Sequence, residues 1–131
     1  MAFFSSTEYK QNGPNILKTD ADFIGLVKNP VKADNWATFT SKLIATAAIV
    51  PDDVVFAASG NDLQVTIAAK SNIDPSGTAI ATDDLSVVVY SSATQKVHIC
   101  QDATNRDITN GAGDTVNIPS LVAFIREYAT V

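Results

Sequence analysis

Hydrophobic and polar residues alternate along much of the second half of the chain, and this pattern predicts β-strands. The clearest run covers residues 85–90, in which Leu85, Val87 and Val89 form one fully apolar face. A second apolar run, residues 97–100, follows after a short polar loop. Valine, isoleucine and tyrosine fit the pleated surface of a half-buried sheet, so the two runs predict an antiparallel hairpin.

Shorter runs of the same kind predict strands on both sides of this hairpin. Upstream, residues 53–58 and 62–69 are separated by a Ser-Gly-Asn turn sequence, so they predict a second hairpin. Downstream, residues 115–118 follow a long polar loop and end at Pro119. Residues 71–83 contain the turn sequence Asp-Pro-Ser-Gly and are expected to form a loop.

Three segments fit either a helix or a strand. Residues 20–30 are too short for their apolar period to separate the two. Residues 34–50 are the best helix candidate, because Asp34 or Asn35 can cap the first turn. The apolar stripe of this helix would consist of Trp36, Phe39, Leu43, Ile44 and Ala47. Residues 120–129 carry both a helical stripe and a strand-like alternation, and the neighbouring strands favour a strand.

Several short strands separated by turns predict a mainly β protein, a small antiparallel β-sandwich with one short helix against it. A chain of 131 residues is expected to form one domain. We divide it into an extended N-terminal arm, residues 1–15, and a β-rich domain, residues 16–131. Phe3 and Phe4 are the apolar anchors of the arm, which is either a frayed terminus or a segment that docks on a neighbour.

The composition of the chain limits its partners. Charged residues make up 18% of the chain, against about 25% in an average domain, so neighbouring subunits are expected to cover part of the surface. The net charge is −5 and the nine basic residues are scattered, which argues against direct binding of nucleic acid. No apolar window has the length of a membrane span, and the single Cys100 excludes an internal disulfide. We therefore expect a soluble protein made in a cytoplasm.

Two groups of residues carry side chains of the kinds used in catalysis or metal binding. His98 and Cys100 are expected on the same face of one strand, with their Cβ atoms about 6–7 Å apart. This distance is too large for direct contact between the imidazole base and the thiol. The loop after them carries oxygen donors that suit calcium, but their spacing does not match an EF-hand. These donors are Asp102, Asn105, Asp107, Asn110 and Asp114. We predict no catalytic, cofactor-binding or metal site and no enzymatic activity, with ordinary turn formation as the role of the loop residues.

The second half of the chain resembles small structural proteins of tailed-bacteriophage virions. The similar segments are Asp84-Leu-Ser-Val-Val-Val-Tyr90-Ser-Ser, Val97-His-Ile-Cys100 and Asn110-Gly-Ala-Gly-Asp-Thr-Val-Asn-Ile-Pro119. The most specific part is Gly-Asp-Thr followed by Ile-Pro at residues 113–119, and the resemblance extends over residues 84–125. It implies a compact β-sandwich without a catalytic site that works by repeated association on a capsid or tail.

On this basis we expect a non-enzymatic virion structural protein, a capsid decoration (cement) protein that binds the shell and neighbouring copies. Its partners would be further copies of itself, as a homo-oligomer, and a major capsid or tail protein, with no direct contact to nucleic acid or membrane. The arm, the sandwich edges and the C-terminal tail are the expected docking elements. The predicted interface residues are Phe3, Phe4, Tyr9, Tyr128 and Val131.

Three other functions stay open at this point. A tail or tail-fibre component would have the same architecture. A carbohydrate-binding or adhesin-like module would need an exposed aromatic platform, for which Trp36 and Tyr90 are the candidates. A small enzyme would have to use His98, the only histidine.

Overall fold

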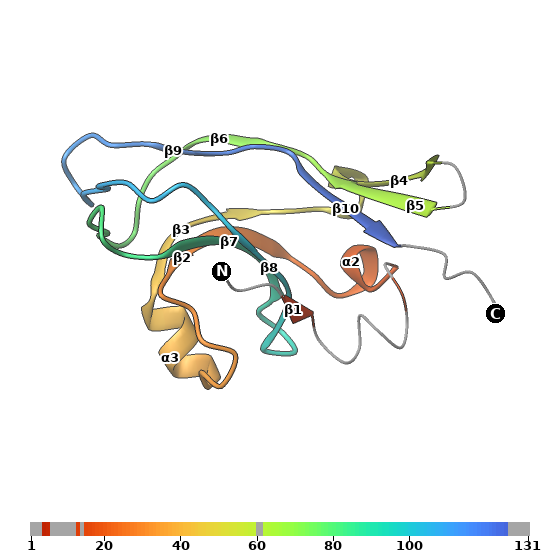
Figure 1. The fold of residues 1–131 in the computed structure, drawn as a ribbon, viewed down its shortest axis with the longest axis horizontal. Coiled ribbons are helices and arrows are strands. Elements are labelled where there is room, and N and C mark those ends of the chain that lie inside the picture. Colours follow the sequence, from red (N-terminus) through yellow and green to blue (C-terminus); the bar gives the residue numbers. More distant parts are fainter. Residues whose placement is uncertain (1–3, 6–12, 14, 60–61, 126–131) are drawn as a thin grey trace.

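The computed structural model describes residues 4–5, 13, 15–59 and 62–125. Its strands lie in two layers of antiparallel sheet, which confirms the mainly β, sandwich-like fold predicted from the sequence (Figure 1). The elements are β1 (Phe4–Ser5), α2 (Ile16–Thr19), β2 (Phe23–Lys28), α3 (Trp36–Ser41), β3 (Leu43–Ala48), the 3-10 helix η1 (Pro51–Asp53), β4 (Val54–Ser59), β5 (Asp62–Ile67), β6 (Lys70–Ile73), β7 (Leu85–Ser91), β8 (Lys96–Asp102), β9 (Val116–Ile118) and β10 (Leu121–Ile125).

One layer is a five-stranded sheet in the order β1-β8-β7-β2-β3. The predicted hairpin is its centre, because β7 pairs with β8 on one side and with β2 on the other. All seven residues of β7 are buried, since one face of the strand contacts the core and the other is covered by aromatic side chains. The first of the ambiguous segments is therefore a strand, β2.

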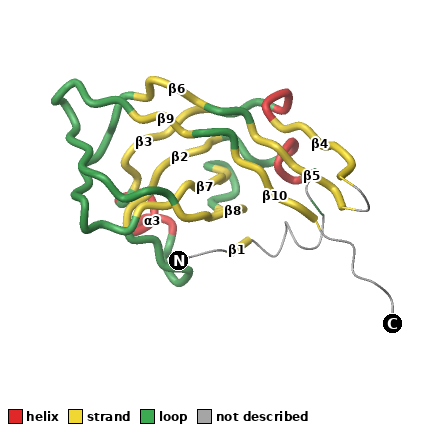
Figure 2. Tube along the Cα trace, turned by 45° about the horizontal axis from the view of Figure 1, so that its top comes forward, coloured by secondary structure: helices red, strands yellow, loops and turns green. Residues whose placement is uncertain are grey.

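The other layer consists of two small sheets, β10-β5-β4 and β6-β9. The predicted hairpin of β4 and β5 is confirmed, and β10 adds to the far side of β5 as a strand. Because β6 follows β5 and β9 precedes β10 in the sequence, the two sheets continue one another across the layer (Figure 2). The core lies between the layers and is formed by Ile24, Ile44, Val65, Ile67, Val89 and Ile118, among others.

The helix predicted over residues 34–50 is wrong in its second half. Helix α3 ends at Ser41, and the following residues form β3, which pairs with β2. Pairing satisfies the backbone of both strands and buries Ile44 in the core, which outweighs the weak helix propensity of a segment with several threonines. The apolar stripe is divided accordingly, because Trp36 and Phe39 pack outside the sheet while Ile44 packs inside it.

The loop predicted over residues 71–83 also needs correction, because it begins within strand β6. This strand pairs with β9 across a register shift and contains Asn72 at a positive φ of 56°. Only Ile73 at its end is buried and apolar, so the irregular pairing leaves no alternating pattern in the sequence. The remainder, around Ser76 and Gly77, is a loop as expected.

Candidate functional site

The outer surface of the sheet β10-β5-β4 carries three of the large apolar side chains that are exposed in the described chain, Val55, Val122 and Phe124. Alternation along these strands turns Val54, Val65 and Ile67 into the core and the intervening residues outward. We call this surface the outer face. It consists of Val55, Ala57, Gln64, Thr66, Val122 and Phe124, none of which is charged.

Strand pairing makes the outer face continuous. Thr66 pairs with Val55 on one side and Val122 on the other, so these side chains form one row across the sheet. Phe124 lies in the next row, opposite Gln64. The exposed fractions are 54% for Val55, 40% for Val122 and 43% for Phe124. Exposed apolar side chains grouped on one face of a sheet are suited to contact with another molecule.

The sequence did not predict these residues as an interface. The signal was present, because Val122 and Phe124 alternate with the buried side of β10 and Val55 adjoins the buried Val54. Knowing which side faces solvent requires the pairing of β10 with β5, whose sequences lie far apart. Without that pairing, the alternation indicates two faces but not which one is covered.

Of the predicted interface residues, only Phe4 lies within the described chain. It belongs to β1, where it pairs with Cys100 while Ser5 pairs with Ile99. The two-residue β1 therefore extends the five-stranded sheet along the edge of β8. The other four, Phe3, Tyr9, Tyr128 and Val131, lie outside the described residues.

A second cluster brings together Asp20, His98 and the turn between β7 and β8. His98 Nε2 lies 2.7 Å from Asp20 Oδ2, and the Thr94 hydroxyl donates to the same oxygen at 2.8 Å. The Ser91 hydroxyl donates to Asp20 Oδ1 at 3.2 Å. Asp22 holds the adjacent residue of the turn, accepting from the Ser92 backbone N–H at 2.9 Å.

The hydrogen bonds of Asp20 with Ser91, Thr94 and His98 hold the end of α2 against β8 and the β7–β8 turn, and we call this cluster the clamp. Burial of Asp20 by itself would raise its pKa, but the hydrogen bonds from Thr94 and His98 outweigh that effect and keep the pKa of the carboxyl below its ordinary value. The imidazole of His98 is 0% exposed, so a substrate in solvent has no route to it. Ser91 donates to the carboxylate rather than to the imidazole, which is not the order of a nucleophile, base and acid.

Cys100 is packed rather than activated. It lies in the apolar cluster outside the five-stranded sheet, and burial raises the pKa of its thiol. Val97 lies in the same cluster although it is three positions away, because a register shift opposite Val89 and Tyr90 makes His98 an extra residue of β8. Simple alternation therefore does not describe the stretch from Val97 to Cys100.

Three of the oxygen-bearing side chains in the loop after β8 accept hydrogen bonds from backbone N–H groups, within the loop or in the segment that precedes and begins β7. Asp107 accepts from the Ala81 backbone N–H at 2.7 Å, Asp114 from that of Thr109 at 2.7 Å, and Asn105 from that of Leu85. Within the described residues, no three His, Cys, Asp or Glu side chains come together as metal ligands. The proposed aromatic platform is also occupied, because Tyr90 is 5% exposed and packs against Trp36, Phe39 and Phe23.

Comparison of the chain with models of known protein families, with curated proteins and with solved structures gives no match. Among the helices of the described residues, none has the length and hydropathy needed to cross a membrane.

Proposed function

We propose that this protein is a non-enzymatic structural protein of a bacteriophage virion, a capsid decoration protein that binds the shell and neighbouring copies. The observation that carries the proposal is the uncharged, exposed outer face formed by Val55, Val122 and Phe124. An apolar face on a rigid sheet suits a protein that associates many times in the same geometry. The resemblance of residues 84–125 to virion structural proteins supports the same function.

Strand β1 and the outer face make two different kinds of contact, in different layers of the sandwich. Strand β1 covers part of the β8 edge, at Ile99 and Cys100, within the same chain. The outer face lies in the other layer of the sandwich, so a molecule bound there would not displace β1. In this arrangement the outer face binds the shell or a neighbouring copy through side chains, and closed rotational symmetry is expected for copies on a symmetric shell.

Charge placed on the outer face tests its role in association. Val122→Glu and Val55→Glu each introduce a carboxylate at an exposed position, so folding should be unchanged. Light scattering across a concentration series should give an oligomer for the wild type and a smaller mass for both variants. The matched control is Val31→Glu, which changes an equally exposed valine in a loop (57% exposed) and should retain the wild-type mass.

The virion assignment is tested separately by analysing particles. Virus particles purified on a density gradient from the lysed source culture should contain the protein in many copies, detected by mass spectrometry. Its complete absence from such particles would refute the virion assignment. If the wild-type protein stays monomeric and binds no particle, the outer face does not have the proposed role in association.

A further inference from the structure

Asn110 and Gly111 begin an exposed turn in the long loop between β8 and β9. An Asn-Gly sequence is typical of a turn, and Gly111 has a positive φ of 85°. A Cβ at Gly111 would meet no atom within 4 Å, so the space beside its backbone is open. Because glycine has no Cβ, its nitrogen can approach the side chain of the preceding residue closely. A second Asn-Gly sequence occurs at residues 12–13, and Asn12 lies outside the described residues.

The backbone nitrogen of Gly111 is not engaged in holding the turn together. Among the hydrogen bonds of the described residues, none uses its N–H. Neighbouring groups close the turn instead: the Ala112 N–H donates to the Thr109 carbonyl oxygen at 3.4 Å, and the Thr109 N–H donates to Asp114 Oδ2 at 2.7 Å. The Gly111 nitrogen can therefore react with a neighbouring group without the loss of a hydrogen bond.

The side-chain amide of Asn110 is held weakly, although it joins the turn to the loop after β6. Its Nδ2 donates to the Ser76 carbonyl oxygen at 3.3 Å, and the Asn110 backbone N–H donates to Thr78 Oγ1 at 3.4 Å. Both distances exceed the range of about 2.7–3.2 Å that is usual for such bonds, so the exposed amide can exchange Ser76 for water. On its other side, this loop is attached to β3, because Ser76 and Gly77 donate their backbone N–H groups to the Ile44 carbonyl oxygen.

We propose that Asn110 is a site of spontaneous deamidation and that this modification loosens the loop after β6. The Gly111 nitrogen attacks Asn110 Cγ, an N–C bond forms, and the Cγ–Nδ2 bond breaks as ammonia leaves with the proton of the Gly111 N–H. Water then opens the cyclic imide at one of its two carbonyl carbons, which gives aspartate or isoaspartate. In both products a carboxylate, which only accepts hydrogen bonds, replaces the amide donor, so the contact with the Ser76 carbonyl oxygen is lost. The reaction needs only water and does not depend on the proposed function.

Peptide mapping of the full-length protein after incubation at pH 8 and 37 °C tests the modification. Trypsin cleaves after Arg106 and Arg126, so Asn110 and Asn117 lie in one peptide. Tandem mass spectrometry should show conversion of the amide to a carboxylate at Asn110 and none measurable at Asn117. If Asn110 stays intact in the folded protein while it converts in the urea-unfolded chain, the folded turn protects it and the proposal is wrong.

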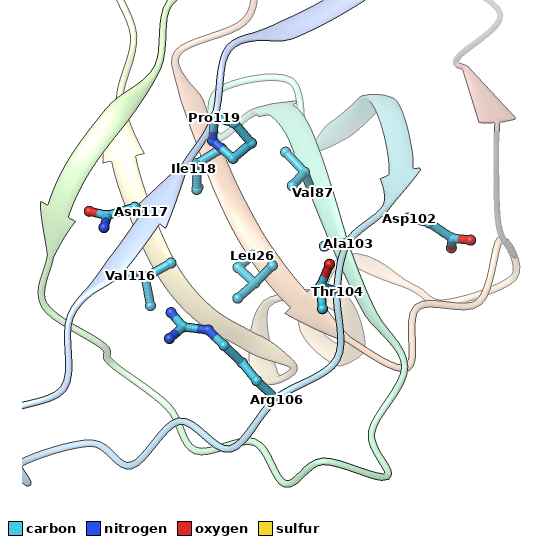
Figure 3. Close-up of a pocket in the computed structure, with 10 residues that line it drawn as sticks. All are labelled: Leu26, Val87, Asp102, Ala103, Thr104, Arg106, Val116, Asn117, Ile118 and Pro119. Atoms are coloured by element: carbon cyan, nitrogen blue, oxygen red, sulfur yellow. The ribbon is translucent and has the colours of Figure 1, made fainter.

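Two asparagines of the same chain are the matched controls. Asn117 lies on the exposed side of β9 (Figure 3), and its Oδ1 accepts from the Asn72 backbone N–H at 2.8 Å. The β-branched Ile118 follows it and hinders approach to the next nitrogen. Asn105 is exposed like Asn110, but an arginine follows it. Conversion of either control as fast as Asn110 would show that the glycine nitrogen has no special role, and would overturn the proposal.

The variant Asn110→Asp, which carries the charge of the product, tests the effect on the loop. Amide hydrogen exchange at Ser76 and Gly77 should be about two- to tenfold faster than in the wild type, the factor that corresponds to the loss of one hydrogen bond. Asn105→Asp is the control, because it adds the same charge at an exposed position and keeps the oxygen that accepts from the Leu85 N–H. Its exchange at Ser76 and Gly77 should equal that of the wild type. Unchanged exchange in Asn110→Asp would show that the modification does not loosen the loop.

Discussion

Asp20 links parts of the chain that lie far apart in the sequence. Its carboxylate receives hydrogen bonds from the turn between β7 and β8 and contacts His98, 78 residues away. The imidazole is fully buried, so loss of the carboxylate would leave a buried polar group without this partner. Asp20 follows directly after α2, and the contact therefore fixes the end of this helix against β8.

Replacement of Asp20 should lower stability in a pH-dependent way. The pKa of the folded-state carboxyl lies below its ordinary value of about 3.9, so its contribution is complete above about pH 4 and is lost as the pH falls through the folded-state pKa. Asp20→Asn should lower the free energy of unfolding at pH 7 by about 1–3 kcal/mol. Urea unfolding at pH 7 and pH 3 should show a smaller acid loss for this variant than for the wild type.

The control for this prediction is Asp52→Asn, which changes an exposed carboxyl in η1. Its stability should stay within about 0.5 kcal/mol of the wild type at both pH values. If Asp20→Asn had the same unfolding free energy and the same acid profile as the wild type, the clamp would have no part in stability.

At the scale of single residues, the sequence did not predict the clamp. The sequence places His98 on a β-strand, and the structure shows that its side chain is fully buried. No local pattern links it to Asp20, because their contact depends on the bulge in β8 and on the path of the chain after α2.

Among the elements, α3 is the one attached mainly by aromatic side chains. Its N-terminus is capped by Asn35, whose Oδ1 accepts from the Thr38 backbone N–H at 2.8 Å. Phe39 and Trp36 pack edge-on against Tyr90, with ring centroids 5.5 Å and 5.8 Å away. Burial raises the pKa of Tyr90 to about 12, and the charge of Asp22 adds to this.

Truncation of Phe39 should loosen α3. Phe39→Ala removes a side chain that is 5% exposed, which costs about 3–5 kcal/mol when a buried phenylalanine is lost. Trp36 fluorescence should shift to longer wavelength, while far-ultraviolet circular dichroism at low temperature keeps the β signal. Thr38→Ala, an exposed change on the same helix, is the control and should leave the fluorescence unchanged. A wild-type emission maximum in Phe39→Ala would contradict the packing role.

Strands were easier to predict than the helix. Alternation identified the hairpins of β4 with β5 and β7 with β8, because these strands keep a period of two except at the bulge in β8. Residues 43–48 kept an apolar spacing that also fits a helix, and only the presence of β2 as a partner makes them a strand. Strand β6 lacked any periodic signal because it is short and irregular.

At the scale of the whole molecule, one core joins the two layers. Ile24 and Val89 of the five-stranded sheet pack in the same buried cluster as Val65 and Ile67 of the other layer. Neither layer can open without exposing the inner face of the other, so the fold should unfold as a unit.

A single transition is therefore expected in denaturant. Trp36 fluorescence, which reports on α3, and circular dichroism, which reports on both layers, should give coincident urea midpoints. Ile67→Ala, at a position 1% exposed, should lower the free energy of unfolding by about 2–5 kcal/mol and move both midpoints equally. A fluorescence transition that precedes the circular dichroism transition would show that α3 and its sheet unfold separately.

The loop after β6 covers part of an outer edge of the five-stranded sheet. Ser76 and Gly77 both donate their backbone N–H to the Ile44 carbonyl oxygen, at 2.7 Å and 3.1 Å, and so cover part of the outermost strand β3. A Cβ at Gly77 would lie 2.7 Å from the Leu43 carbonyl oxygen, so only glycine permits this approach. The unpaired N–H and C=O groups of an exposed edge strand can pair with a strand of another molecule, which leads to aggregation into fibres. With part of this edge occupied by the protein's own loop, β3 is protected there from the addition of a strand from another molecule.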